Sequence, residues 1–387
     1  VDSEERGVIK INKTFLFVFL LTNIPFLYAY FYDDPNGLVS VDFSLSEAIV
    51  LHVLCTIFFL AGYFFTFLVS RKSYVNRCYT LRGPVFVVLM SLSVLGVFTS
   101  IWQIQQTLPI MDYFSSMLTG QTGAEVRDAY LLDSRSGGLP GYIKIFNNAP
   151  LAVFLFACAA VNYLNLDQAS MRQMKRLLFF SFFFVVFKTF LSLDRITILA
   201  LMLCYFDYGA RKGFTFKQVA VLFFLLVIAN VLSMSRMQGY SVFDFVFMYM
   251  KLGLINLQLL LQVDYGYTFG FQTIFHFLTY VWPGVNDSLG IEFQDYKWFW
   301  NPALYFASYG YLDFGYFVLL LYSFLGALSA FFDTGVKRNN SKVLISLYFV
   351  FLYAVASLFT VPVIRGVEFV LAVLLASFFA IFLVKKV

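Results

Sequence analysis

Long apolar segments alternate with short polar ones along almost the whole chain. A helix needs about 20 residues to cross the hydrocarbon core of a bilayer, and apolar runs of this kind recur between residues 13 and 384. The pattern predicts an all-α polytopic membrane protein with about ten transmembrane helices. The predicted spans are 13–32, 48–70, 83–105, 142–165, 177–193, 195–210, 217–233, 311–332, 343–360 and 367–384.

Two further apolar segments, 242–261 and 269–283, leave the number of crossings open. If both crossed the membrane, the link from Gln262 to Thr268 would be cytoplasmic, although it contains Asp264 and neither Lys nor Arg. We therefore favour interfacial or re-entrant helices in an outer layer, with twelve spans as the alternative. Both arrangements have an even number of crossings, so the two termini share one side.

The basic residues predict which side that is. Eighteen of the 27 Lys and Arg residues fall on the side of the termini. Cytoplasmic loops of helical membrane proteins carry an excess of Lys and Arg, so we expect both termini in the cytoplasm. The eighteen are Arg6, Lys10, Lys13, Arg71, Lys72, Arg77, Arg82, Arg172, Lys175, Arg176, Arg211, Lys212, Lys217, Lys337, Arg338, Lys342, Lys385 and Lys386.

Composition restricts the class of protein further. The chain is 60% hydrophobic and 13% charged, with 51 Phe, which excludes an ordinary soluble domain. We expect one integral domain over residues 1–387, in contact with membrane lipids. The net charge of +5 comes mostly from the cytoplasmic loops and does not indicate nucleic-acid binding. Four Cys and two His show no metal-ligand spacing, and we predict neither a metal nor a cofactor.

Two loops on the outer side, 106–141 and 234–310, are too long to be simple connectors. They are rich in Tyr, Trp, Asp and Gly, and we expect them to contain short amphipathic helices. Their aromatic residues favour either an interfacial belt or stacking platforms for sugar rings. Tyr142, which follows the first loop, and Tyr240, within the second, are candidate substrate-binding residues.

Asp194 and Arg195 lie between two short predicted spans. About 16 residues make roughly 24 Å of helix at about 1.5 Å per residue, which is less than a hydrocarbon core of about 30 Å. Both side chains should therefore lie below the outer surface, where ionisable residues are paired or functional. They either lock the bundle through partners on other helices or line an outward cavity.

Four arginines come from separate segments at the predicted outer boundary: Arg127, Arg195, Arg236 and Arg365. The arginine side chain keeps its charge and binds phosphate in a bidentate way. If the four converge, they form a site for a pyrophosphate head group, with Arg135 in reserve. Snorkelling of each arginine to lipid phosphate is the alternative.

The first loop contains Arg127, followed after ten intervening residues by Gly138. This pair is similar to the Arg-x10-Gly element of the bacterial O-antigen polymerases. Arg195 opens a span, as in the family's short Gly/Ser-Arg segment. A second Arg-x10-Gly is absent, because Phe247 stands where the glycine after Arg236 would be.

The C-terminal third adds to this resemblance. Asn301-Pro302, followed by Tyr309-Gly-Tyr-Leu-Asp313-Phe-Gly315, looks like the family's Asn-Pro…Tyr-x-Asp-Phe-Gly signature. Arg365-Gly366 matches its terminal Arg-Gly. The resemblance covers roughly residues 105–370.

The family implies a function at the periplasmic face of the bacterial inner membrane. That function is polymerisation of undecaprenyl-pyrophosphate-linked oligosaccharide repeat units, without a catalytic metal. The expected architecture is a C-type glycosyltransferase-like bundle with two large periplasmic loops. A chain-length-regulating co-polymerase is a candidate partner.

Such a transfer needs cations for the departing diphosphate and a base for the attacking hydroxyl. We assign the arginines to the first task, and Arg195, Asp194 and His276 are the candidate catalytic residues. Asp194 is favoured by its depth and His276 by its ordinary pKa. Asp313 could be a base or could cap the helix beside it. Further candidate bases are Glu125, Asp128, Asp133 and Glu368.

Rival functions share parts of this pattern. A ligase that moves finished glycan to another acceptor would use the same lipid pyrophosphate donor. A flippase for lipid-linked oligosaccharide would favour charged residues through the full bilayer depth and an internal repeat, and none is visible in the sequence. A structural partner in a polysaccharide assembly complex is the third alternative.

Overall fold

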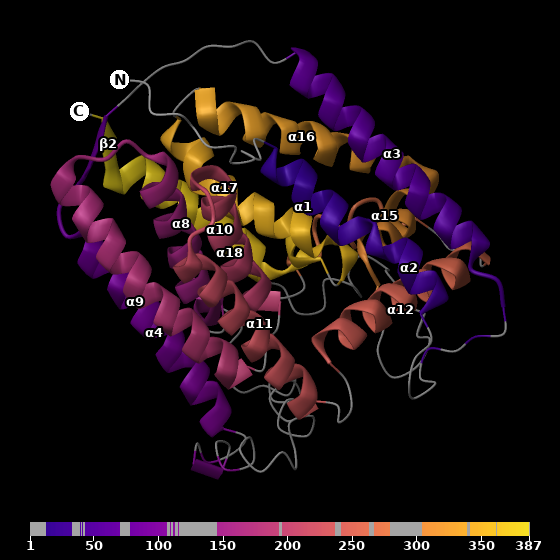
Figure 1. Cartoon of the computed structure of the whole chain (residues 1–387), viewed down its shortest axis with the longest axis horizontal. Coiled ribbons are helices and arrows are strands. Elements are labelled where there is room, and N and C mark those ends of the chain that lie inside the picture. Colours follow the sequence, from indigo (N-terminus) through magenta and orange to yellow (C-terminus); the bar gives the residue numbers. More distant parts are fainter. Residues whose placement is uncertain are drawn as a thin grey trace.

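The structure is a computed structural model, and among the residues that it describes eight helices are long and apolar enough to cross a membrane. It describes residues 13–32, 39, 41, 43–69, 78–106, 109, 111–112, 115, 145–192, 196–236, 241–262, 267–278, 304–338, 341–360 and 362–386. The helical architecture confirms the all-α polytopic class, while the number of crossings stays a prediction. Figure 1 shows the arrangement of the helices.

The helices follow the predicted apolar segments closely. The longer ones are α1 (Thr14–Asn23), α3 (Ser46–Val69), α4 (Val85–Gln105), α8 (Ala149–Tyr163), α9 (Gln168–Ser192), α10 (Ile196–Lys212), α11 (Phe216–Arg236), α12 (Val242–Gln262), α16 (Val318–Arg338), α17 (Lys342–Ala356) and α18 (Val367–Phe378). The shorter elements are α2 (Pro25–Phe31), α15 (Phe306–Phe314), η1 (Ile145–Asn148), η2 (Gly315–Phe317), η3 (Ser357–Phe359), η4 (Val363–Arg365), η5 (Phe379–Leu383), β1 (Tyr79–Leu81) and β2 (Val384–Lys386).

Among the differences from the predicted boundaries, those in the first span, in α9 and in the span 311–332 are described here by their local structure. The first span is divided into α1 and α2, because Pro25 begins a new helix after Ile24. α9 begins at Gln168, well before the predicted start at residue 177, since its basic first turns are helical as well. The predicted span 311–332 starts earlier, at Phe306, and bends at Gly315, where φ is +56°.

Glycines allow the closest helix contact in the bundle, between α3 and α16. A Cβ atom added at Gly62 would lie 2.0 Å from the backbone oxygen of Ser323. A Cβ atom added at Gly326 would lie 2.0 Å from the backbone oxygen of Phe59. Van der Waals contact drives helix association in lipid, and small residues increase it because they let two backbones approach closely.

One end of the bundle carries a short two-stranded ribbon. β1 pairs with β2 in an antiparallel way, and Tyr79 forms a bridge with Leu166. Nζ of Lys342 donates to the backbone oxygen of Val384 at 2.6 Å. All these residues belong to segments that the charge pattern assigns to the cytoplasm, so the structure brings the predicted inner segments together. We call this end the ribbon end; β2 lies at the upper left of Figure 1.

α12 lies along the opposite end, where α2 ends and α3 begins. Oδ1 of Asp244 accepts a hydrogen bond from the Tyr32 hydroxyl at 3.3 Å, and Nζ of Lys251 donates to the backbone oxygen of Tyr32. Near the other end of α12, Oε1 of Gln258 accepts from the backbone N–H of Ala48 at 3.0 Å. The interfacial placement predicted for 242–261 stays a prediction, and α12 is long and apolar enough to be a span.

The helix predicted over 269–283 is wrong for residues 269–277, which form turns. Phe269 and Gly270 both have positive φ, +48° and +92°, and this reverses the chain. The twelve-span alternative needs a helix there, so the described residues do not support it.

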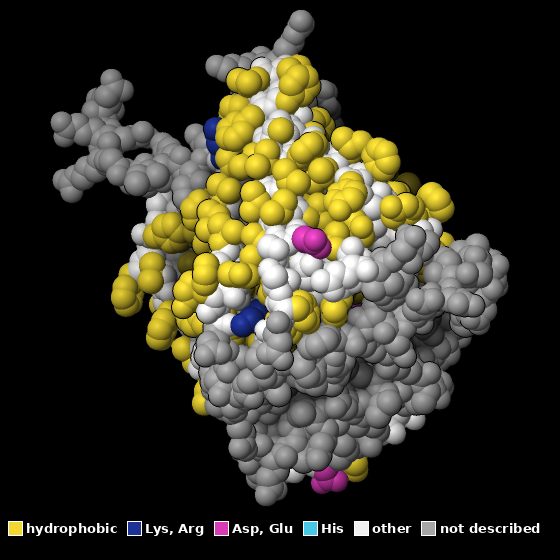
Figure 2. All heavy atoms as spheres, turned by 90° about the vertical axis from the view of Figure 1, so that its right-hand side faces the viewer, with side chains coloured by type: hydrophobic (Ala, Val, Ile, Leu, Met, Phe, Trp, Pro, Cys, Tyr) yellow, Lys and Arg dark blue, Asp and Glu magenta, His cyan; other side chains and the backbone are white. Residues whose placement is uncertain are grey.

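The surface away from the two ends is apolar. Figure 2 shows hydrophobic side chains over most of the described surface on one face, with few charged groups. Such a surface suits contact with lipid acyl chains. Exposed examples are Phe31, Val50, Ile57, Phe65, Leu68, Leu320 and Phe324.

Candidate functional site

The structure describes only part of the predicted site. Arg127, Arg135, Tyr142, Asp194, Arg195 and Tyr240 lie outside the described residues, and so do Glu125, Asp128 and Asp133. Arg236 ends α11, but its side chain is not among those described. Convergence of the four arginines therefore stays a prediction. Arg365 and His276 are described, and the charge of Arg365 acts on His276.

Arg365 is held inside the protein at the end opposite the ribbon. It closes η4, and its side chain is only 6% exposed. The guanidinium Nε donates to the backbone oxygen of Gln272, and Nη2 donates to the side-chain oxygen of Gln272 at 3.1 Å. The guanidinium carbon lies 3.2 Å from the ring centroid of Tyr309, in a cation–π contact. Among the residues that the structure describes, neutral groups thus orient this permanent positive charge.

The segment 267–278, which we call the clasp, supplies Gln272. It is fastened to the C-terminal end of α15 by Asp313, which is fully buried. One carboxylate oxygen accepts from the Thr268 hydroxyl at 2.5 Å and the Gln272 N–H at 2.8 Å. The other accepts from the N–H and hydroxyl of Thr273 at 2.7 and 2.6 Å. Asp313 therefore does not cap the following helix but organises the clasp.

Backbone contacts complete the junction between the clasp and α15. The N–H of Thr268 donates to the backbone oxygen of Leu312, and that of Phe269 to the backbone oxygen of Asp313, both at 3.1 Å. A Cβ atom added at Gly315 would come within 2.7 Å of the Tyr267 hydroxyl oxygen. Glycine at this position, with its positive φ, lets the clasp lie directly on the helix end.

His276 belongs to the clasp and is partly buried. Burial first, and then the positive charge of Arg365, lower the pKa of His276 from 6.5 to about 4. The imidazole is consequently neutral at pH 7 and can accept a proton. Two of the predicted site residues, Arg365 and His276, are thus close enough to interact electrostatically.

Two other ionisable residues, the candidate base Glu368 and Lys188, have different surroundings. Glu368 is exposed in the first turn of α18, beside Gly366. Nζ of Lys188 donates to Oδ1 of Asn148 at 2.9 Å, which ties α9 to the start of α8. Lys188 thus contributes to packing between helices.

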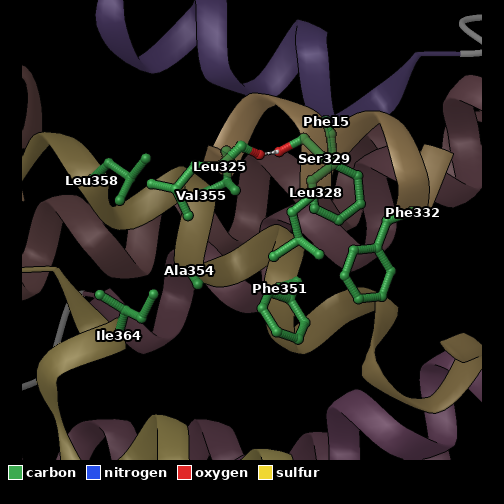
Figure 3. Close-up of a pocket in the computed structure, with 10 residues that line it drawn as sticks. All are labelled: Phe15, Leu325, Leu328, Ser329, Phe332, Phe351, Ala354, Val355, Leu358 and Ile364. Carbon is green, nitrogen blue, oxygen red and sulfur yellow. Dashed lines mark hydrogen bonds between the residues drawn. The ribbon is translucent and has the colours of Figure 1, made fainter. Parts of the chain in front are cut away.

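Figure 3 shows a small cavity between α1, α16, α17 and the segment before Arg365. Its lining is apolar except for Ser329, whose hydroxyl donates to the backbone oxygen of Leu325 at 2.7 Å. The lining offers no charged group to a substrate, so this cavity is a packing gap and not the candidate site. Ile364 forms its wall next to Arg365.

Two buried carboxylates lie near the ribbon end and have no role in the sequence predictions. Asp207 accepts from the hydroxyls of Thr14, Tyr163 and Tyr348 at 3.0, 2.9 and 3.1 Å. Asp333 accepts from the Tyr63 hydroxyl at 2.8 Å and from the backbone N–H of Phe15 at 3.2 Å. They fasten the start of α1 to α10 and α16.

Comparison with known proteins returns no relative. No family model, no curated protein and no solved structure matches the chain. The resemblance to O-antigen polymerases therefore rests on the motifs in the sequence.

Sequence reasoning missed two residues of the site, Gln272 and Tyr309. Nothing in Phe271-Gln272-Thr273 marks the glutamine, since its role depends on a turn that the distant Asp313 helps to hold. The spacing of Tyr309 was a weak indication of its role. It precedes Asp313 by four residues, so the two side chains share one face of a helix.

Proposed function

We propose that this protein is a membrane glycosyltransferase that polymerises oligosaccharide repeat units from a lipid-diphosphate donor. The single observation that supports this most is the buried, oriented Arg365 beside a neutral His276. The remaining parts of the proposal are the undecaprenyl carrier, the periplasmic side and the bacterial inner membrane, and these rest on the family resemblance and the charge pattern.

The cation suits a leaving group that gains negative charge. Arg365 is nearly excluded from water and held in place by Gln272 and Tyr309. A preorganised charge in such surroundings acts more strongly on a developing anion than one in water, and it does not need to reorient during reaction. A departing lipid diphosphate is an anion of this kind.

The neutral imidazole suits the second requirement of glycosyl transfer. An attacking sugar hydroxyl must lose its proton as the new glycosidic bond forms, while the bond to the diphosphate breaks. His276 keeps an unprotonated nitrogen at neutral pH because burial and Arg365 lower its pKa. A general base contributes about 10²–10⁴-fold to a rate, most when its pKa lies near the working pH. The lowered pKa makes His276 a weaker proton acceptor, so we expect its contribution at the lower end of that range.

Glycan length in a strain without the gene tests the proposal. Complementation with the wild-type gene should restore a ladder of long glycan, whereas the uncomplemented strain should carry lipid A-core capped with a single repeat unit. Loss of even the single-unit cap would instead favour a ligase or a flippase. Purified protein should extend lipid-linked repeat units by itself; no turnover would favour a structural role.

The pH dependence of turnover tests His276 as the base. Because its pKa is about 4, the base form persists well below pH 6.5, and activity should fall only as the pH approaches 4. The unfolded chain takes up this proton near pH 6.5, so folding stability should also decrease as the pH falls from 6.5 to 4. Turnover by purified protein between pH 4 and 8 measures the first effect.

His276→Gln is the control for that profile and should lack the acid limb while retaining a low residual rate. An acid limb centred near pH 6.5 in the wild-type protein would exclude His276 as the base. Asp194, outside the described residues, would then become the leading candidate.

A further inference from the structure

Asp313 is the group on which the geometry around Arg365 depends. It is fully buried, and four donors from the clasp point at its two oxygen atoms. The donors come from three residues that are far from Asp313 in sequence but next to one another in the clasp. One carboxylate thus fixes the path of the clasp on the end of α15.

Gln272 transmits this order to Arg365. Its N–H donates to Asp313 at 2.8 Å, while its backbone and side-chain oxygens accept from Nε and Nη2 of Arg365. The N–H and the backbone oxygen of Gln272 belong to successive peptide planes, which are joined only through the φ and ψ angles of this residue. A bond that fixes the N–H therefore restrains the direction of the oxygen as well. Tyr309, one helical turn before Asp313 on α15, covers the guanidinium face.

We infer that Asp313 is a positioning residue, which orients the Arg365 guanidinium through Gln272 and does not itself exchange a proton with substrate. The use of that orientation, namely to stabilise a lipid diphosphate, rests on the proposed function. The orientation of Arg365 does not rest on the proposed function, and it can be measured without following turnover.

The neutral amide of asparagine cannot replace this carboxylate. Asparagine offers one acceptor oxygen, and its NH₂ group would face N–H and O–H donors. Asp313→Asn should therefore release Gln272 and let Arg365 move away from the clasp. Gln272→Ala is a milder variant, because it removes only the bond from Nη2 to the side-chain oxygen.

The pKa of His276 reports the position of Arg365. The chain has only two histidines, so NMR of protein labelled at histidine gives two titrating signals, and His276→Gln assigns the one from the clasp. Among the described residues, the charge that acts on His276 is that of Arg365 in η4, and the titratable groups of α15 next to the clasp are Tyr309 and Asp313.

The experiment is a double-mutant cycle on this pKa in purified full-length protein. Asp313→Asn should raise the pKa of His276 by about one unit or more, the usual effect of moving one nearby charge. In an Arg365→Gln background, the same substitution should have much less effect. Gln272→Ala should give a smaller rise that likewise depends on Arg365.

Equal shifts of the pKa in the two backgrounds would overturn the proposal, because Asp313 would then act on His276 only through the folding of the clasp. If Asp313→Asn fails to fold, the Gln272→Ala pair decides in the same way. If the effects of Asp313→Asn and Arg365→Gln on the pKa of His276 are non-additive but the protein makes no glycan, the positioning role of Asp313 stands and the proposed function is rejected.

Discussion

Replacing Arg365 with alanine is expected to abolish long-chain glycan while the protein still accumulates in the membrane. The substitution removes a permanent charge that is 6% exposed and oriented by Gln272 and Tyr309. Loss of one preorganised electrostatic group at a reacting centre lowers kcat by about 10²–10³-fold. The measurement is the glycan ladder in a complemented deletion strain, together with turnover by purified protein.

Two variants make this result specific. Arg365→Lys keeps the charge but loses the planar fork that matches Gln272 and a diphosphate, so its activity should be intermediate. Arg172→Ala removes an exposed arginine from α9 near the ribbon end and should leave the ladder unchanged. A normal ladder in Arg365→Ala would remove Arg365 from the catalytic site.

Replacing Asp207 with alanine is expected to cause the largest loss of stability. Asp207 is fully buried and accepts hydrogen bonds from three hydroxyls on α1, α8 and α17. Each buried hydroxyl that loses its acceptor destabilises the fold by about 1–3 kcal/mol. The free energy of unfolding should therefore fall by about 3 kcal/mol or more, measured by titration with SDS in mixed micelles.

Asp207→Asn is the matched control, since it keeps one acceptor oxygen in nearly the same volume. Its loss of stability should be clearly smaller than that of Asp207→Ala. Equal stability of Asp207→Ala and the wild-type protein would show that these hydroxyls do not depend on the carboxylate.

Much of the helical framework could be predicted from the sequence, for a simple physical reason. A bilayer imposes a fixed length of apolar helix on each span, and this requirement is visible locally in the chain. Helices α3, α4, α11 and α17 accordingly lie within a few residues of their predicted bounds. The predicted boundaries were wrong where apolar length does not decide the helix end. Pro25 divides the first span, and α9 begins with basic turns that precede its apolar part.

Less of the candidate site could be predicted from the sequence, because the site depends on contacts between segments that are distant in the chain. Arg365 was predicted as a diphosphate-binding residue from its type and its place beside the last span. The structure shows that it is buried and held, while its role stays a prediction. Gln272 has no local signal at all, since it reaches Arg365, 93 positions away, only through the turn that Asp313 organises. His276 was proposed as a base for its ordinary pKa, whereas the structure gives it a lowered one.

The sequence by itself determined the class of this protein, an all-α polytopic membrane protein, and predicted one side for most of its basic residues. Hydrophobicity and charge act along the chain, so residue order alone carries them. Only the tertiary structure decided that Asp313, Gln272, Arg365 and Tyr309 form one unit, and that Asp207 and Asp333 fasten α1. Hydrogen bonds between buried groups depend on distances of a few ångströms, and these exist only after the helices have packed.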